Sequence, residues 1–501
     1  MSAGLAVVGR VWTGDPSRPW AGGLVVADGR VQAVLAEGAA APGERVLRLA
    51  PEWAVLPGFV DPHVHLLATA AGVLSVDLAG VPDVETLLAR LAAESAWGSA
   101  GRGAWLRAHG WDESLTTEGR QPTVAELDRA VPDRPLVVHH ATGHAALLNG
   151  AALRQVGTDD PRLERGAEGR PTGVVAEPAA VLAGLVPPLG WEELRRASGA
   201  VSAAMAAAGL VAVGDATHTN DRLALERLEE LSVDGVVAQR IVAMVGSGSV
   251  GLLRGAGLRP GDPVSGGDGG GPFRLGHGKV MPDPADPSGS IAAGIEECRA
   301  HRWPVAVHCV DVEELSAALA LAGDRNASWP DRLEHVGLCL PEQVAAVASS
   351  GADVVTNPRF MVDRALKYRR QLSEPEQEWL YRMGSFVSSG VRVAAGSDSP
   401  TGVPDPLGMV AAAASRPGPE RVRLSEALGA VTTSAAGVCG LSGPLRPGAA
   451  ADLVVLDRFP DTAEAAAGAT VLATLIEGAA AHGSDALPAE VWAPGGLAGR
   501  K

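Results

Sequence analysis

Beyond residue 57, short apolar runs alternate with longer helical stretches, and this alternation limits the fold more than any other feature of the chain. Residues 303–307 form one such apolar run, whereas residues 84–94 and 191–208 are rich in Ala, Leu, Glu and Arg. Buried strands that alternate with helices in this way are typical of β/α units on a parallel sheet. We therefore expect an α/β fold for the middle of the chain.

Both ends of the chain have a different pattern. Residues 5–8, 23–26 and 30–35 alternate in the manner of β-strands, with turns at Gly-Asp and Asp-Gly. Residues 451–457 and 469–476 return to the same β pattern. We expect the two β ends to form one small domain together.

Polar residues recur where the apolar runs of the middle region stop. In a (β/α)8 barrel, the carboxyl ends of the strands and the loops after them build the active site. Polar residues at these positions would therefore converge in space. They are His144, Asp215, His218, Lys279, His308, His335 and Asp398.

An apolar run at residues 56–66 ends in two histidines, His63 and His65. On a strand this spacing places both imidazoles on one face. Imidazole is a common ligand of zinc, copper, iron and nickel, so two on one face make half of a metal site. The alternative is that one histidine is a hydrogen-bonded core residue and the other is incidental, and the pair alone does not decide between the two.

Lysine is rare in this chain, where arginine supplies nearly all the positive charge. Only Lys279, Lys367 and Lys501 are lysines, and Lys279 lies in a mostly apolar, strand-like segment. Burial of an ammonium is costly unless it is paired or chemically changed. Either the chemistry of Lys279 is used, or its head group reaches water from the end of a strand.

Composition excludes several classes of partner. The chain has 501 residues and a net charge of -16, which argues against a nucleic-acid or anionic-membrane partner. It has no secretory signal and no apolar stretch long enough to span a bilayer, so we expect a cytoplasmic protein. A barrel of this size often self-associates, which leaves a homodimer open, although no interface can be located.

The order of these polar residues, framed by the two β ends, resembles the amidohydrolase superfamily. Further motifs are similar to its amidohydrolase-3, YtcJ-like branch, which includes N-substituted formamide deformylases. These motifs are residues 110–113 (GWDE), 127–135 (LDRAVPDRP), 142–149 (TGHAALLN), 173–177 (GVVAE) and 447–457 (PGAAADLVVLD). The resemblance spans essentially the whole chain.

The resemblance implies an α/β fold with a (β/α)8, TIM-like barrel at residues 57–440. It also implies a composite β-sandwich domain from residues 1–56 and 441–501, and an inserted subdomain at about residues 70–200, after the first barrel strand. The expected cofactor is a divalent metal, usually zinc, in one or two sites. The substrate would be a small molecule.

The same resemblance implies the roles of the polar residues. His63, His65 and Asp398 would hold one ion, and His308 and His335 a second. Two cations about 3.5 to 4 Å apart need a shared anion, which a carboxylated Lys279 would supply. A metal-bound hydroxide would attack an amide, formamide or cyclic amide C–N bond, with Asp398 as general acid and base.

Other residues are candidates for contact with the substrate. His144 could contact the substrate oxygen or could be a core or capping histidine. Trp111 and Asp112 could line the pocket, although a Gly-Trp pair is as often a packing feature. Glu177 could reach the site, although we favour a salt bridge with an arginine. Arg359 could bind a substrate carboxylate through two hydrogen bonds.

Two departures from the family pattern fall in loops expected to touch the substrate. Residues 281–284 (MPDP) follow Lys279 where relatives usually carry Asp-Gly, and residues 357–359 (NPR) replace the more usual Gln-Pro. Neither change removes a metal ligand. The alternatives are a deaminase or metal-dependent isomerase on the same scaffold, since fold does not fix reaction, or a non-catalytic metal-binding protein.

Overall fold

The structure is a computed structural model that forms two compact units. It describes residues 5–39, 45–97, 104–141, 143, 145–176, 178–266, 270–321 and 329–483. The first unit contains the chain up to residue 65, residues 202–363 and the chain from residue 372. The second contains residues 66–201 and 364–371.

Eight parallel strands form the central sheet of the first unit, with each strand paired to the next along the chain. The backbone of Val64 also bridges that of Ser399, just beyond the last strand, so the sheet closes on the first strand. The predicted (β/α)8 barrel is confirmed. The strands are β6 (Phe59–Val64), β13 (Leu210–Asp215), β14 (Arg240–Gly246), β15 (Phe273–Val280), β16 (Val305–Cys309), β17 (Arg332–His335), β18 (Asp353–Thr356) and β19 (Val393–Ala395).

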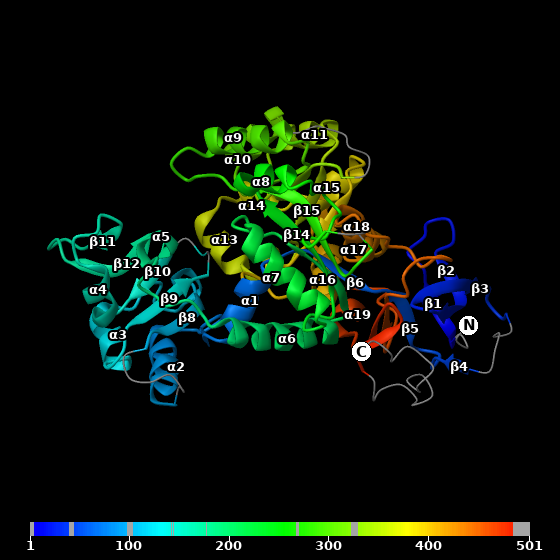
Figure 1. Ribbon diagram of the computed structural model, residues 1–501, viewed down its shortest axis with the longest axis horizontal. Helices are drawn as coiled ribbons and strands as arrows, with labels where there is room; N and C mark the ends of the chain where they lie inside the picture. The colour runs from blue at the N-terminus through cyan, green and yellow to red at the C-terminus, as the bar shows by residue number, and fades with distance from the viewer. Residues whose placement is uncertain are drawn as a thin grey trace. The chain divides into compact units, whose positions relative to one another are not determined.

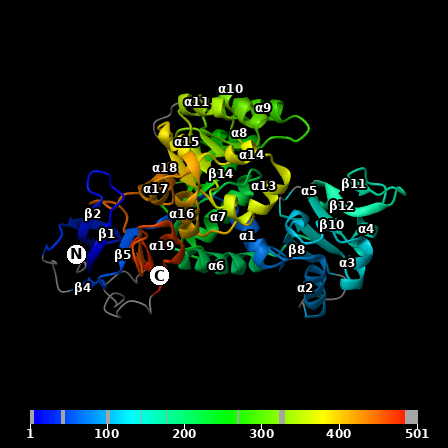
Figure 2. The same ribbon diagram turned by 180° about the vertical axis from the view of Figure 1, so that it is seen from behind.

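Helices connect the barrel strands and lie outside them (Figure 1), as the view from behind also shows (Figure 2). Within the described ranges, no helix is long and apolar enough to cross a membrane. The helices are α7 (Arg222–Val233), α8 (Val250–Gly255), α9 (Pro287–Ala300), α10 (Val312–Leu321), α11 (Pro341–Ser350), α12 (Phe360–Asp363), α14 (Glu374–Glu378), α15 (Met383–Ser388), α16 (Pro406–Ser415), α17 (Leu424–Ala430) and α18 (Thr433–Val438).

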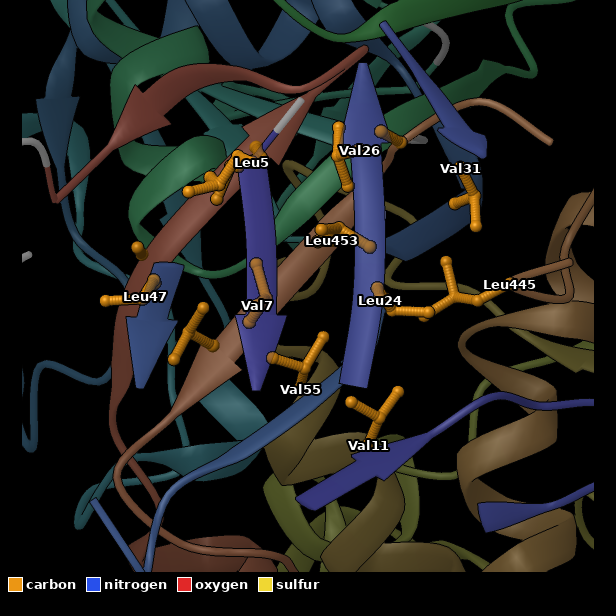
Figure 3. Packing of buried hydrophobic residues seen from close by; sticks show 14 residues of the cluster. Leu5, Val7, Val11, Leu24, Val26, Val31, Leu47, Val55, Leu445 and Leu453 are labelled. Carbon is orange, nitrogen blue, oxygen red and sulfur yellow. The ribbon is translucent and has the colours of Figure 1, made fainter. Parts of the chain in front are cut away.

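The two β ends of the chain form one eight-stranded sheet in the same unit, because β5 pairs antiparallel with β20. Inward-facing leucines and valines from both ends share one core, in which Leu453 packs among Leu5, Val7 and Leu24 (Figure 3). The two ends of the chain therefore pair in one sheet, whereas the limits of a separate domain at residues 1–56 and 441–501 stay a prediction. The strands are β1 (Leu5–Trp12), β2 (Trp20–Ala27), β3 (Arg30–Leu35), β4 (Arg45–Arg48), β5 (Ala54–Pro57), β20 (Leu453–Leu456), β21 (Val471–Ile476) and β22 (Ala479–His482), with α19 (Ala463–Gly468) between β20 and β21.

The second unit is built on a six-stranded sheet with a hydrophobic core on each face. Alternation along β9 produces both cores, since Leu136 and Val138 join one and Val137 joins the other. The limits of 70–200 for the insertion stay a prediction. The elements are α1 (Leu66–Val73), β7 (Val76–Asp77), α2 (Val84–Trp97), β8 (Leu106–Trp111), α3 (Val124–Ala130), β9 (Leu136–His140), β10 (Ala145–Leu148), α4 (Gly150–Val156), β11 (Leu163–Arg165), β12 (Pro171–Ala176), α5 (Pro178–Leu182), α13 (Ala365–Gln371) and the start of α6 (Trp191–Ala207).

Candidate metal centre

Closure of the barrel brings His63, His65 and Asp398 together. The amide of Asp398 donates to the carbonyl of His63 over 2.8 Å, and the amide of His65 donates to the carbonyl of Ser399 over 2.8 Å. Asp398 has a φ of 60°, in the left-handed region that few non-glycine residues adopt. Its Oδ1 lies 3.5 Å from Nε2 of His63 and 3.2 Å from Nε2 of His65. Such strained backbone is typical of functional sites.

Three histidines at the barrel strand ends each have their Nδ1 atom engaged, and for two of them, His63 and His335, the partner decides which group donates. The Glu334 carboxylate can only accept, and the Asn357 amide already donates to the Gly396 carbonyl, so the histidine Nδ1–H is the donor in both contacts. This assignment fixes the tautomers of the His63 and His335 rings and leaves their Nε2 lone pairs for a metal, as is usual for metal-binding histidines. The pairs are His63 with Glu334 at 2.5 Å, His65 with Thr217 Oγ1 at 3.1 Å and His335 with Asn357 at 2.8 Å.

His308 and Lys279 complete the group. The ring centroids of His308 and His335 are 4.7 Å apart, and those of His335 and His63 are 4.6 Å apart. Lys279 is buried, its Nζ has no hydrogen-bond partner among the described residues, and burial lowers its pKa. After burial itself, the charge of Lys279 helps to lower the pKa values of the three histidines. The three rings are those of His63, His308 and His335.

The sequence reasoning missed Glu334, which holds His63 in place. Glu334 is fully buried and receives hydrogen bonds from Arg332, 2.8 Å from Nε to Oε1 and 3.1 Å from Nη2 to Oε2. Although burial alone would raise the pKa of Glu334, the charges of Arg332 and His63 hold it well below its usual range. One signal could have revealed this carboxylate: opposite charges at i, i+2 in a strand that is otherwise buried must be paired.

The donor set fits a divalent metal. His63, His65 and Asp398 each offer a ligand atom, and these atoms lie within 4.8 Å of one another. Burial, and then the charge of Lys279, lower the pKa of His63 to about 3, so its ring is neutral at pH 7. With Nδ1 as the donor, the Nε2 lone pair of His63 faces the Asp398 carboxylate, and two acceptors that face each other are stabilised by a cation between them. Imidazole and carboxylate together suit zinc and other transition metals.

Trp111 and Asp112 lie in the second unit. Trp111 is fully buried in a hydrophobic core, and within the part of the chain that the structure describes its indole N–H has no hydrogen-bond partner. Asp112 begins a short 3-10 helix, where it accepts from the Ser114 amide at 3.0 Å and from the Lys367 ammonium at 3.0 Å. Nε2 of His140 lies 3.8 Å from Oδ1 of Asp112. Their predicted contact with the substrate stays a prediction.

The remaining residues predicted to contact the substrate are Arg359, which lies in the first unit, and His144 and Glu177. Arg359 is engaged by two carboxylates, with its Nε 2.9 Å from Asp363 and its Nη1 in contact with Asp405. A substrate carboxylate would have to compete with these partners. His144 and Glu177 lie outside the described residues.

A (β/α)8 barrel with a metal site at its strand ends is typical of metal-dependent hydrolases, and we assign the protein to this class. Comparison with known families then identifies the family. Residues 53–482 match the model of the amidohydrolase family. The chain belongs to this family. Its activity is therefore metal-dependent hydrolysis of a carbon–nitrogen bond.

Individual relatives agree with this assignment. The chain is 28% identical to the N-substituted formamide deformylase of Arthrobacter pascens, over 91% of this chain and 93% of that protein. It is 33% identical to the putative amidohydrolase YtcJ of Bacillus subtilis, over 25% of each chain. The fold matches a metal-dependent hydrolase of Pyrococcus horikoshii with a TM-score of 0.70, at 22% identity over 92% of this chain and 98% of that one.

Proposed function

We propose that the chain hydrolyses the amide, formamide or cyclic amide bond of a small molecule at a centre that holds one or two zinc ions. The observation that carries this proposal is that the Nδ1 atoms of His63 and His335 donate to Glu334 and Asn357, which leaves their Nε2 atoms for a metal. His63, His65 and Asp398 would hold one ion, and His308 and His335 the other. Lys279, carboxylated at its unpaired Nζ, would bridge them.

Bound metal would polarise the scissile carbonyl and lower the pKa of water towards about 7. The chain's own residues would do the rest. Asp398 has its pKa held below the usual carboxyl range, because the hydrogen bond with His65 and the charges of His335 and His63 outweigh the effect of burial. It is therefore ionised at neutral pH and would accept a proton from the nucleophile, then deliver it to the leaving nitrogen.

Exposed apolar side chains around the strand ends favour a substrate with an apolar substituent. Val310 follows β16, Val362 lies in the helix after β18 and Val403 follows β19, with exposed fractions of 44%, 61% and 56%. Single exposed valines are ordinary, but these three all follow barrel strand ends. The Arthrobacter relative is named for N-substituted formamides, and an apolar substituent on nitrogen would suit these side chains. We expect N-arylalkyl formamides to have a higher kcat/KM than N-methylformamide.

The proposed role of Asp398 is tested by Asp398→Asn. We expect a loss of about 10²–10⁴ in kcat on any hydrolysed amide, the range that general acid–base groups contribute. Metal content is measured on the same sample, because Asp398 is also a proposed ligand. Asp311→Asn, an exposed carboxylate in the loop after β16, is the control and should keep wild-type turnover. Unchanged turnover in Asp398→Asn would refute the role, and release of ammonia would favour the deaminase alternative.

Carboxylation of Lys279 has its own test. Protein purified with ¹³C-bicarbonate should show a carbamate carbon signal that disappears in Lys279→Gln and persists in Lys367→Gln. Lys367 is the matched control because its ammonium is already paired with Asp112. A signal that survives Lys279→Gln, or no signal in the active wild type, would contradict the proposal.

A further inference from the structure

The first unit contains a cavity at the end of the barrel opposite to the histidines of the proposed metal centre. This cavity of about 530 Å³ is lined by the first residues of four strands, among them Val60, Val211, Arg240 and Arg274. The loop that leads into β20, residues 441–450, forms another wall. The metal ligands lie at the other ends of these parallel strands, so the cavity is separate from the proposed active site. Its volume suits a small organic molecule.

The walls of the cavity carry an excess of positive charge. Four arginines and two carboxylates line it, which leaves two positive charges more than negative. Both carboxylates are used by Arg240, whose Nη2 is 3.3 Å from Glu477 and whose Nη1 contacts Asp452. In a chain with a net charge of -16, arginines outnumber carboxylates here. The four arginines are Arg30, Arg240, Arg274 and Arg446.

The guanidinium of Arg274 is incompletely satisfied among the described residues. Its Nε is buried, and no residue in the described ranges accepts a hydrogen bond from it. Burial, and then the nearby charge of Arg240, lower the pKa of Arg274, yet arginine stays charged at neutral pH. A buried donor without an acceptor and two neighbouring like charges both favour an anion in the cavity. Arg446 and Arg30 are exposed on the same cavity and could reach a bound ligand.

We propose that this cavity binds a small organic dianion, with its phosphate or carboxylate oxygens received by Arg274 and Arg446. Guanidinium groups bind both head groups through paired hydrogen bonds. Two negative charges would balance the excess on the walls. The Ser442 hydroxyl, which lines the same cavity, offers a further donor. Such a ligand would connect the β domain of the two chain ends to the barrel and would stabilise the folded protein.

Calorimetric titration of the metal-loaded protein with inorganic phosphate and, separately, with succinate tests this proposal. We expect saturable 1:1 binding of at least one of them, about tenfold weaker in Arg446→Gln and in Arg274→Gln. Glu477→Gln should bind about threefold more tightly, because it removes a negative charge from the wall. Arg170→Gln is the control, since Arg170 is exposed and lies in the second unit.

Each result of the titrations either identifies the class of anion that the cavity binds or rejects the cavity as an anion site. Binding of phosphate alone indicates a phosphate-bearing ligand, and binding of succinate alone indicates a dicarboxylate. Weaker binding in Arg446→Gln at an unchanged metal content separates this site from anion binding at the metal centre. If Arg274→Gln fails to fold, Arg446→Gln still decides, because Arg446 is exposed. No saturable binding of either anion, or binding that Arg446→Gln leaves unchanged, would overturn the proposal.

Discussion

Replacement of Glu334 by glutamine tests a residue that positions the metal ligand His63 but is not itself a proposed ligand. Glu334 accepts from His63 at 2.5 Å and from Arg332 at 2.8 Å, with no exposure to solvent. Glutamine keeps the size of the side chain, but it loses the charge, and its amide N–H groups face the donors of Arg332 and His63. Loss of such a support for a metal-binding histidine typically weakens metal binding 10- to 100-fold, or about 1.4 to 2.7 kcal/mol.

Stability should fall as well, because the buried charge of Arg332 loses the carboxylate that accepts two of its hydrogen bonds. Loss of one partner of a buried ion pair costs about 3–5 kcal/mol of unfolding free energy, and the remaining amide oxygen places Glu334→Gln near the lower value. The assays are competition with a chelator for metal affinity and urea unfolding for stability. Glu229→Gln is the control, since Glu229 is a buried carboxylate that accepts from Ser265 and is remote from the metal centre. If Glu334→Gln binds metal as tightly as the wild type, the account of His63 is wrong.

Three further predictions follow from the same structure. A Cβ at Gly396 would lie 2.8 Å from Cβ of His63, so Gly396→Ala should displace His63 and weaken metal binding about tenfold in the chelator assay, whereas Gly255→Ala, with open space around it, should not. Burial raises the pKa of Asp353 to about 6, so its protonated form is favoured in the folded state. Asp353 therefore stabilises the folded state below its unfolded pKa of about 4, and this stabilisation of roughly 2–3 kcal/mol is lost as the pH rises to about 6. Asp353→Asn should remove this pH dependence of the unfolding free energy in urea. A pH profile that the substitution leaves unchanged would contradict the prediction. Dialysis against a chelator should abolish hydrolysis, and added zinc should restore it; full activity without metal would be inconsistent with the family's chemistry.

The parallel α/β sheet was predictable because apolar runs alternate with helices along the chain, and several of these runs end in a polar residue. The number of strands and their closure into a barrel were predicted from the resemblance to the amidohydrolase superfamily. The convergence of His63, His65 and Asp398 also followed, because carboxyl ends of parallel strands meet at one end of a barrel.

Glu334 could not be assigned in the same way. Strict alternation places Glu334 and His335 on opposite faces of a strand, so only one of them was expected in the site. The structure breaks this rule with positive φ values of 67° at His335 and 46° at Val336, and both Glu334 and His335 contribute. Thr217 and Asn357 were missed for a related reason: their roles depend on which ring nitrogen of a histidine they contact, and sequence does not specify a tautomer.

The metal content of the purified protein is the most direct test of the central claim. Protein expressed with ample zinc should contain one or two zinc ions per chain by mass spectrometry of the metals. Substitution of His65 by asparagine should reduce that content, and substitution of His301, a histidine remote from the site that pairs with Glu297, should not. A wild-type protein without any bound divalent metal would contradict the account.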